Sequence, residues 1–262
     1  MSHFNQVLTE IAGELQMSNT SRNKAIVSAN YLISSVYKEF KNRVESVHLF
    51  GSFIRGTNLN PRLLSGSDID VLVVFNEDEK YLPKTYRNQL NRFVNKYYKA
   101  SVVANSCPAT VLSLEHIRFD ITPATKVNSW FLADELYIPD GYGRWKEIDS
   151  VIDEQKLTFI TSKYGQRVID ITRIFKLWNC SVNNPFKSFE LEKQILSLNF
   201  KGNTLETGFV YAVEYLDANG NSKAYKSIQK LQQTVETILS LPRANKRDLI
   251  WEQMQQLFFP NR

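Results

Sequence analysis

The spacing of apolar residues divides this chain into a mixed first half and a helical second half. In the first half, helical periodicity alternates with short β-like runs. Residues 55–67 contain Gly, Asn and Pro without any period, so we expect a loop there. Helices are predicted at 3–17, 19–41 and 83–99, and strands at 46–54, 69–75, 101–106, 109–115 and 117–124.

From about residue 146 the β-like pattern ends. One or two helices are predicted in 149–179 and further helices at 187–200, 222–241 and 245–258, whereas 204–217 fits either type. We therefore expect an α+β fold: a mixed sheet with flanking helices, followed by a helical C-terminal half. The predicted domains are residues 1–145 and 146–262, with the N-terminal helices packing across both.

Composition narrows the class of protein. A chain of 262 residues with 43% hydrophobic and 23% charged residues is typical of a globular protein, and no apolar run is long enough to cross a membrane. The N-terminus has no signal-peptide pattern, which indicates a cytoplasmic protein. Cys107 and Cys180 lie far apart and away from the three histidines, so zinc chemistry is not expected. The net charge of +5 favours anionic ligands such as nucleotides or nucleic acid.

Three aspartates are the candidate chemical groups. Asp68 and Asp70 lie where the strand 69–75 begins, and alternation along a strand puts them on the same face. Two carboxylates this close repel each other unless a cation lies between them. Asp120 stands in an apolar run on a later strand, where an unpaired charge is costly. Carboxylates suit Mg²⁺, and three of them predict a two-metal site for phosphoryl transfer.

A Gly-Ser pair, Gly51-Ser52, ends the strand that precedes the aspartates. Glycine lets the backbone approach a phosphate, and the serine hydroxyl and amide can donate hydrogen bonds to it. Alone, such a pair is commonly a turn, and an Asp-x-Asp pair is commonly two solvated residues at a strand end. Together with a third aspartate, and in this order, they point to nucleotide chemistry.

These motifs resemble the signature of the polymerase-β-like nucleotidyltransferases, through FGSFIRGT, SDIDVLVVF and FDITPA. The chain is most similar to the bacterial cGAS/DncV-like nucleotidyltransferases (CD-NTases) of CBASS anti-phage defence. LYIPDGYGRW (136–145) and RIFKLWN (173–179) add to the resemblance, which covers about residues 45–180. It implies a nucleotidyltransferase sheet with flanking helices and a helical C-terminal half, two-lobed and cage-like.

The resemblance implies that the three carboxylates are catalytic and bind metal. Asp68 and Asp70 would bind both of two Mg²⁺ ions, or Mn²⁺ in their place. Asp120 would bind the catalytic ion and help to deprotonate the acceptor hydroxyl.

Four further residues are implied to bind the donor nucleotide. Gly51 and Ser52 would hold its triphosphate. Arg55 would bind phosphate or, alternatively, cap the loop. Lys176 would reach the donor phosphates or, alternatively, be a solvated helix lysine.

We therefore expect a Mg²⁺-dependent enzyme that condenses nucleoside triphosphates, releases pyrophosphate and makes a cyclic di- or oligonucleotide messenger for anti-phage signalling. Its expected partners are nucleoside triphosphates and an effector or regulatory protein; we expect a monomer with no membrane association.

A CCA-adding or poly(A)-type enzyme acting on RNA is the alternative function. A non-catalytic nucleotide-binding relative is a third hypothesis, although such a relative would normally have lost a carboxylate. An RNA-binding surface could come from basic residues of the C-terminal half: Lys187, Lys193, Lys201, Lys223, Lys226, Lys230, Arg243, Lys246 and Arg247.

Overall fold

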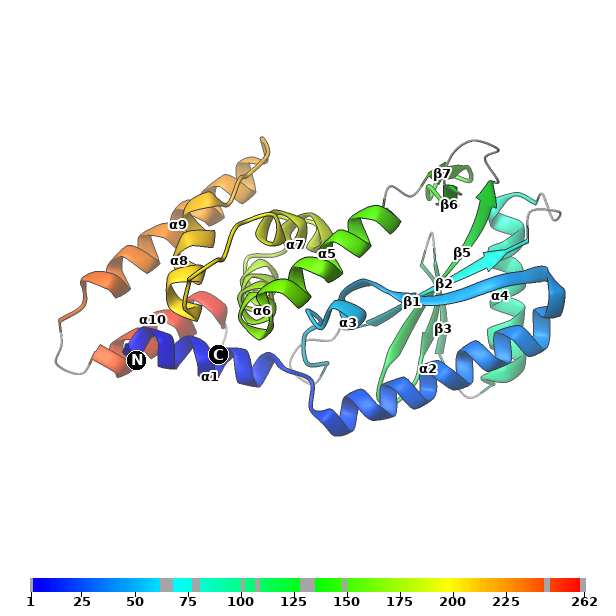
Figure 1. Cartoon of the computed structure of the whole chain (residues 1–262), viewed down its shortest axis with the longest axis horizontal. Coiled ribbons are helices and arrows are strands. Elements are labelled where there is room, and N and C mark those ends of the chain that lie inside the picture. Colours follow the sequence, from blue (N-terminus) through cyan, green and yellow to red (C-terminus); the bar gives the residue numbers. More distant parts are fainter. Residues whose placement is uncertain are drawn as a thin grey trace. The chain divides into compact units, whose positions relative to one another are not determined.

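The computed structural model describes residues 2–61, 68–76, 81–99, 102–106, 109–127, 135–147, 150–242 and 246–259. The sequence predictions for Cys107, for Arg243 and for loop residues 62–67 lie outside these ranges. The chain divides into two compact units, one formed by Met17–Lys156 and one by Met1–Gln16 together with Leu157–Arg262. We call the first the sheet unit and the second the helical unit (Figure 1).

The sheet unit contains the expected alternation of helices and strands. Its elements are α2 (Asn19–Phe40), the 3₁₀ turn η1 (Lys41–Arg43), β1 (Val44–Phe50), α3 (Gly51–Arg55), β2 (Asp68–Phe75), α4 (Pro83–Tyr97), β3 (Val102–Ser106), β4 (Ala109–Ser113), β5 (Arg118–Val127), β6 (Glu135–Pro139) and β7 (Trp145–Glu147). α2 begins at an N-cap, Ser18, whose side chain accepts a hydrogen bond from the Ser21 amide.

The strands form one mixed sheet in the order β1-β2-β5-β4-β3, with β6 paired to β5 and β7 paired to β6. β2 and β5 are parallel neighbours at its centre, and the remaining pairs are antiparallel. The mixed sheet with flanking helices confirms the predicted α+β class. This central parallel pair carries all three candidate aspartates.

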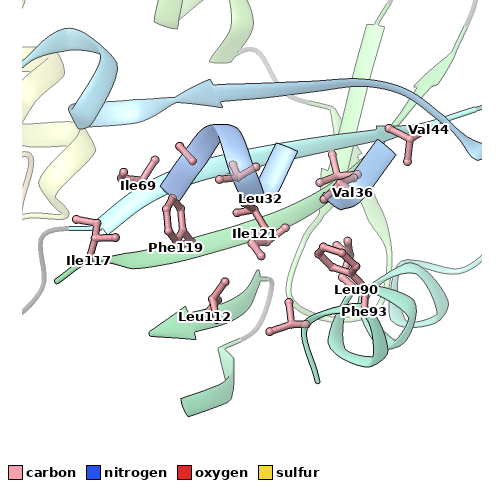
Figure 2. Close-up of a cluster of buried hydrophobic side chains, with 14 of the residues drawn as sticks. Leu32, Val36, Val44, Ile69, Leu90, Phe93, Leu112, Ile117, Phe119 and Ile121 are labelled. Atoms are coloured by element: carbon pink, nitrogen blue, oxygen red, sulfur yellow. The ribbon is translucent and has the colours of Figure 1, made fainter. Parts of the chain in front are cut away.

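One face of the sheet holds the main hydrophobic core of this unit. Figure 2 shows Leu32 of α2 and Phe93 of α4 packed over Phe119 and Ile121 of β5. Alternate residues of β2 also point to this face and are fully buried: Ile69, Val71, Val73 and Phe75. α2 and α4 therefore cover the face to which the odd-numbered residues of β2 and β5 point.

The even-numbered residues of β2 and β5 point to the opposite face. There Leu72, Val74 and Ala124 form a second, smaller cluster, against which Phe50 packs. The same alternation continued toward the start of β2 and β5 gives Asp68, Asp70, Arg118 and Asp120. The apolar part of each strand thus lies between two hydrophobic clusters. The polar start of each strand lies outside the smaller cluster and carries the charged side chains.

The helical unit consists of α1 (His3–Leu15), the second half of α5 (Ser150–Tyr164), α6 (Gln166–Ser181), α7 (Ser188–Leu196), α8 (Leu205–Tyr215), α9 (Ser222–Ser240) and α10 (Lys246–Phe258). α1 packs on α6, α8 and α10 within it, with its buried face formed by six apolar residues. These are Phe4, Val7, Leu8, Ile11, Ala12 and Leu15. No helix among the described residues is both long and apolar enough to span a membrane.

The division into units differs from the predicted domains in two respects. α1 groups with the C-terminal helices because its apolar face is buried among them, whereas the prediction joined it to the sheet. The second division falls within α5, after Lys156, and not at residue 145. Of the two N-terminal helices, α1 belongs to the helical unit and α2 packs on the sheet, and the expected packing of these helices across both halves stays a prediction.

Two local structures differ from the sequence prediction, and one that it left open is decided. Residues 51–55, placed in a strand and its loop, form the short helix α3. The ambiguous segment 204–217 is helical, and Thr204 starts it with a capping box to Thr207. β6 and β7 were not predicted because they are short and lie in a segment rich in Pro and Gly.

Candidate active site

The register of the central strands brings two of the candidate carboxylates opposite each other. Asp70 of β2 is paired with Asp120 of β5, and Asp68 is paired with Arg118. The side chains of Asp68 and Asp120 are 27% and 18% exposed, so solvent ions can reach them. The aspartates predicted as a group from the sequence therefore lie together on one face of the sheet.

Gly51 brings the backbone into contact with this group. It follows Phe50, which pairs with Asp70, and it has a φ of +74°, which favours glycine. A Cβ added to Gly51 would lie 2.1 Å from Oδ2 of Asp70. The sequence predicted that the backbone at Gly51 approaches a phosphate. In the structure the group that this backbone approaches is the carboxylate of Asp70.

Ser52 lies in the short helix α3, and a tight turn follows that helix. The Ser52 carbonyl accepts hydrogen bonds from the amides of Thr57, at 2.9 Å, and Asn58, at 3.1 Å. Arg55 is only 4% exposed and interacts within the fold. Its burial favours the alternative in which it holds the loop, while phosphate binding by Ser52 and Arg55 stays a prediction.

Arg118 is a residue at this site that the sequence analysis missed. Its Nε and Nη2 each donate to one oxygen of Asp120, both at 2.8 Å, and Nη2 lies 4.0 Å from Oδ2 of Asp68. These hydrogen bonds raise the pKa of Arg118, against the opposing effect of burial. The signal was present in the sequence, because Arg118 stands two residues before Asp120 and must share its face.

Lys176 lies in the helical unit, whereas the other six predicted site residues lie in the sheet unit. Its Nζ is 2.9 Å from Oε2 of Glu192 on α7, and the two side chains are 8% and 1% exposed. The lysine is thus buried in an ion pair, in contrast to the solvated alternative. Its contact with donor phosphates stays a prediction.

The motif LYIPDGYGRW forms the hairpin of β6 and β7 and the turn between them. Oδ1 of Asp140 accepts hydrogen bonds from the amides of Tyr142, at 2.7 Å, and Arg144, at 3.0 Å, and these bonds lower the pKa of Asp140. Trp145 packs on Tyr86, with ring centroids 5.7 Å apart. The turn is therefore fixed by Asp140, and Trp145 belongs to the packing of the sheet unit.

The donor set fits a divalent cation of the Mg²⁺ type in its chemistry. It consists of carboxylate oxygens, which are hard ligands, on adjacent strands and on one face. Within the described ranges, however, no three acidic, His or Cys side chains are gathered so as to hold an ion as they stand. Both oxygens of Asp120 accept hydrogen bonds from Arg118.

Sequence comparison finds a family and a relative. Residues 1–158 match the domain family described as Second Messenger Oligonucleotide or Dinucleotide Synthetase. A probable cyclic nucleotide synthase of Bacillus cereus strain VD146 is 28% identical over 181 residues, which are 56% of this chain and 54% of that protein. The match therefore spans about half the length of that curated relative.

Solved structures share the fold over nearly the whole chain. The CD-NTase CdnG of Bradyrhizobium diazoefficiens, in complex with GTP, has a TM-score of 0.78 at 12% identity, over 98% of both chains. CdnC of Escherichia coli MS115-1, in a complex with HORMA-deltaN, has a TM-score of 0.75 at 13% identity, over 98% of this chain and 97% of that one. These likenesses, together with the family match, confirm the predicted resemblance to CD-NTases and their fold.

Proposed function

We infer that this chain, which belongs to the Second Messenger Oligonucleotide or Dinucleotide Synthetase family, is a metal-dependent nucleotidyltransferase. It joins nucleoside triphosphates and releases pyrophosphate, and its product is a cyclic di- or oligonucleotide messenger in anti-phage signalling. The observation that carries the proposal is the carboxylate face, which we define as Asp68, Asp70 and Asp120 on adjacent strands of one sheet face.

Each residue of the carboxylate face has a role in this proposal. Asp68 and Asp70 hold two Mg²⁺ ions, or Mn²⁺ in their place, and Asp120 holds the catalytic one. Bound metal supplies activation of the attacking hydroxyl and stabilisation of the leaving phosphate oxygen. A carboxylate oxygen of Asp120 accepts the proton of the acceptor hydroxyl. The protein otherwise positions its substrates and neutralises their charge, which is what phosphoryl transfer requires.

The donor triphosphate is proposed to lie along Gly51 and Ser52. The contact between Gly51 and the carboxylate of Asp70 supports this, because a phosphate at that turn would lie next to the metal ligands. GTP in the CdnG complex is in keeping with a nucleoside triphosphate as substrate. A regulatory protein is a further proposed partner, as the CdnC complex with HORMA-deltaN contains one.

The RNA-directed alternative is favoured by one observation on α9. Lys223, Lys226 and Lys230 recur at helical spacing and are all exposed, so they present a basic stripe. Such a stripe can contact a nucleic-acid backbone. The same lysines also suit an ordinary solvated helix, so we keep this function as the alternative.

Asp70→Asn tests the proposed function. Wild-type protein, given all four nucleoside triphosphates with Mg²⁺ and no RNA, is expected to form a small nuclease-resistant product, identified by mass spectrometry. Asp70→Asn is expected to lower product formation by at least about 100-fold, because the amide is a poor ligand for the metal. Its circular dichroism and melting temperature should stay close to wild type, since the side chain is not in the core.

Glu147→Gln is the matched control, because it removes an exposed carboxylate of the same sheet outside the carboxylate face. It should retain full activity. Product formation by Asp70→Asn at the wild-type rate would contradict the proposed chemistry. Nucleotide addition that requires added RNA would establish the alternative.

A further inference from the structure

Arg118 is a cation supplied by the protein itself to the carboxylate face. Its two bonds to Asp120 form a planar fork, which is a strong arrangement for an arginine–carboxylate pair. The same Nη2 also lies 4.0 Å from Asp68. One guanidinium therefore interacts with carboxylates of both central strands.

We propose that Arg118 is an internal counter-ion, which holds Asp120 until a divalent cation displaces it. This inference rests on the proposed function, because it concerns the same metal site. Three carboxylates on one face repel each other, and one guanidinium among them reduces that repulsion. An ion that takes Asp120 must compete with Arg118 for the same two oxygens.

The surroundings of Arg118 allow this exchange. Its side chain is 39% exposed, so the guanidinium can move toward solvent without opening a packed core. Arginine carries a long flexible stem, which lets the head change place while the strand stays fixed.

The proposal is tested by metal affinity, which does not depend on turnover. Mn²⁺ is titrated into metal-free protein without nucleotide, and the free ion is followed by its electron paramagnetic resonance signal. Arg118→Gln is expected to bind Mn²⁺ about three- to tenfold more tightly than wild type, the size expected when a half-exposed ion pair no longer competes. Arg118→Lys should lie between the two, because lysine keeps the charge but not the fork.

Melting temperatures provide a second readout. In EDTA, Arg118→Gln should melt below wild type, because the carboxylates lose their counter-ion. In saturating Mn²⁺ this difference should shrink, because the metal replaces the lost charge. A purely structural arginine would lower the melting temperature equally in both conditions.

Lys126→Gln is the matched control. Lys126 lies six residues after Asp120 on the same strand and pairs with Glu45 at 3.0 Å, so the substitution removes one positive charge from the same side of the sheet without touching the three aspartates. Its Mn²⁺ affinity should equal that of wild type. Unchanged or weaker Mn²⁺ binding by Arg118→Gln would overturn the counter-ion proposal.

Asp70→Asn separates this proposal from the proposed function. If Asp70→Asn abolishes Mn²⁺ binding while Arg118→Gln leaves it unchanged, only the role of Arg118 is wrong. If Asp70→Asn binds Mn²⁺ as tightly as wild type, the metal site itself is wrong. Absence of Mn²⁺ binding in both wild type and Arg118→Gln would overturn the counter-ion proposal alone, because the proposed function is tested by product formation in the presence of nucleotide.

Discussion

At Gly51 the backbone comes so close to Asp70 that a side chain cannot fit between them. A Cβ there would lie 2.1 Å from Oδ2 and 3.3 Å from Cβ of Asp70, so the aspartate would have to turn away. The positive φ adds strain for any residue with a side chain. The position of one carboxylate thus depends on a residue that has no functional group of its own.

Gly51→Ala is accordingly expected to impair both stability and activity. The backbone strain should cost about 1–3 kcal/mol of unfolding free energy, measured by chemical denaturation. Turnover should fall by at least about tenfold through displacement of Asp70. Gly141→Ala is the matched control, because Gly141 has a φ of +88° but nothing within 4 Å of an added Cβ. Equal turnover of the two variants would show that the contact with Asp70 has no role.

Single residues also mark the limit of what the sequence predicts. Asp68 and Asp70 could be assigned to one face, because alternation along a strand is a local rule. The pairing of Asp70 with Asp120 could not be predicted from the sequence, because the register of parallel strands is set by the packing of distant segments. The placement of Arg118 on the face of Asp120 follows from the same local rule, because the two residues are two positions apart on one strand.

At the scale of elements, α6 and α7 are joined by a buried ion pair. Lys176 and Glu192 are both almost excluded from solvent. A buried pair contributes little net stability compared with apolar residues of similar size, but loss of one partner leaves an uncompensated charge. The sequence predicted both helices; it could not reveal this pair, because the partners lie on different helices.

Glu192→Gln is expected to lower the unfolding free energy by roughly 3–5 kcal/mol, because Lys176 stays buried without its counter-charge. The double variant Lys176→Met with Glu192→Leu should recover most of this loss. Glu39→Gln is a suitable control, since Glu39 pairs with Lys96 at a similar distance but on the surface, and its effect should be much smaller. An equally small effect of Glu192→Gln would contradict the picture of a buried pair.

If Lys176 also contacts donor phosphates, the double variant will show a raised KM for nucleotide despite its recovered stability.

At the scale of the whole molecule, the chain passes twice between the units. It leaves the helical unit after α1, builds the sheet unit and returns within α5. α1 is fixed within the helical unit by a Phe4–Phe209 contact and by a hydrogen bond from the Glu206 amide to Asn5. The sequence predicted a helix at residues 3–17 but not its partners, because a local helical pattern does not specify what the helix packs against.

Leu8→Ala is expected to destabilise the helical unit selectively. Leu8 is fully buried on α1, and its truncation should cost about 2–5 kcal/mol. Hydrogen exchange followed by mass spectrometry should show faster exchange in α6, α8 and α10, with β2 and β5 little changed. Leu32→Ala, equally buried on α2, should give the reverse pattern. Faster exchange confined to the sheet unit in Leu8→Ala would contradict the assignment of α1.

The double passage of the chain has a consequence for how such proteins can exchange parts during evolution. A single recombination point cannot transfer the complete helical unit, because its first helix is encoded before the sheet unit and its others after it. The family match over residues 1–158 likewise includes the whole sheet unit and one helix of the other. The sheet unit, in contrast, is encoded by one continuous stretch of gene. That stretch can be inserted into another gene with junctions near Met17 and Leu157, so that the recipient gene retains its own helical unit.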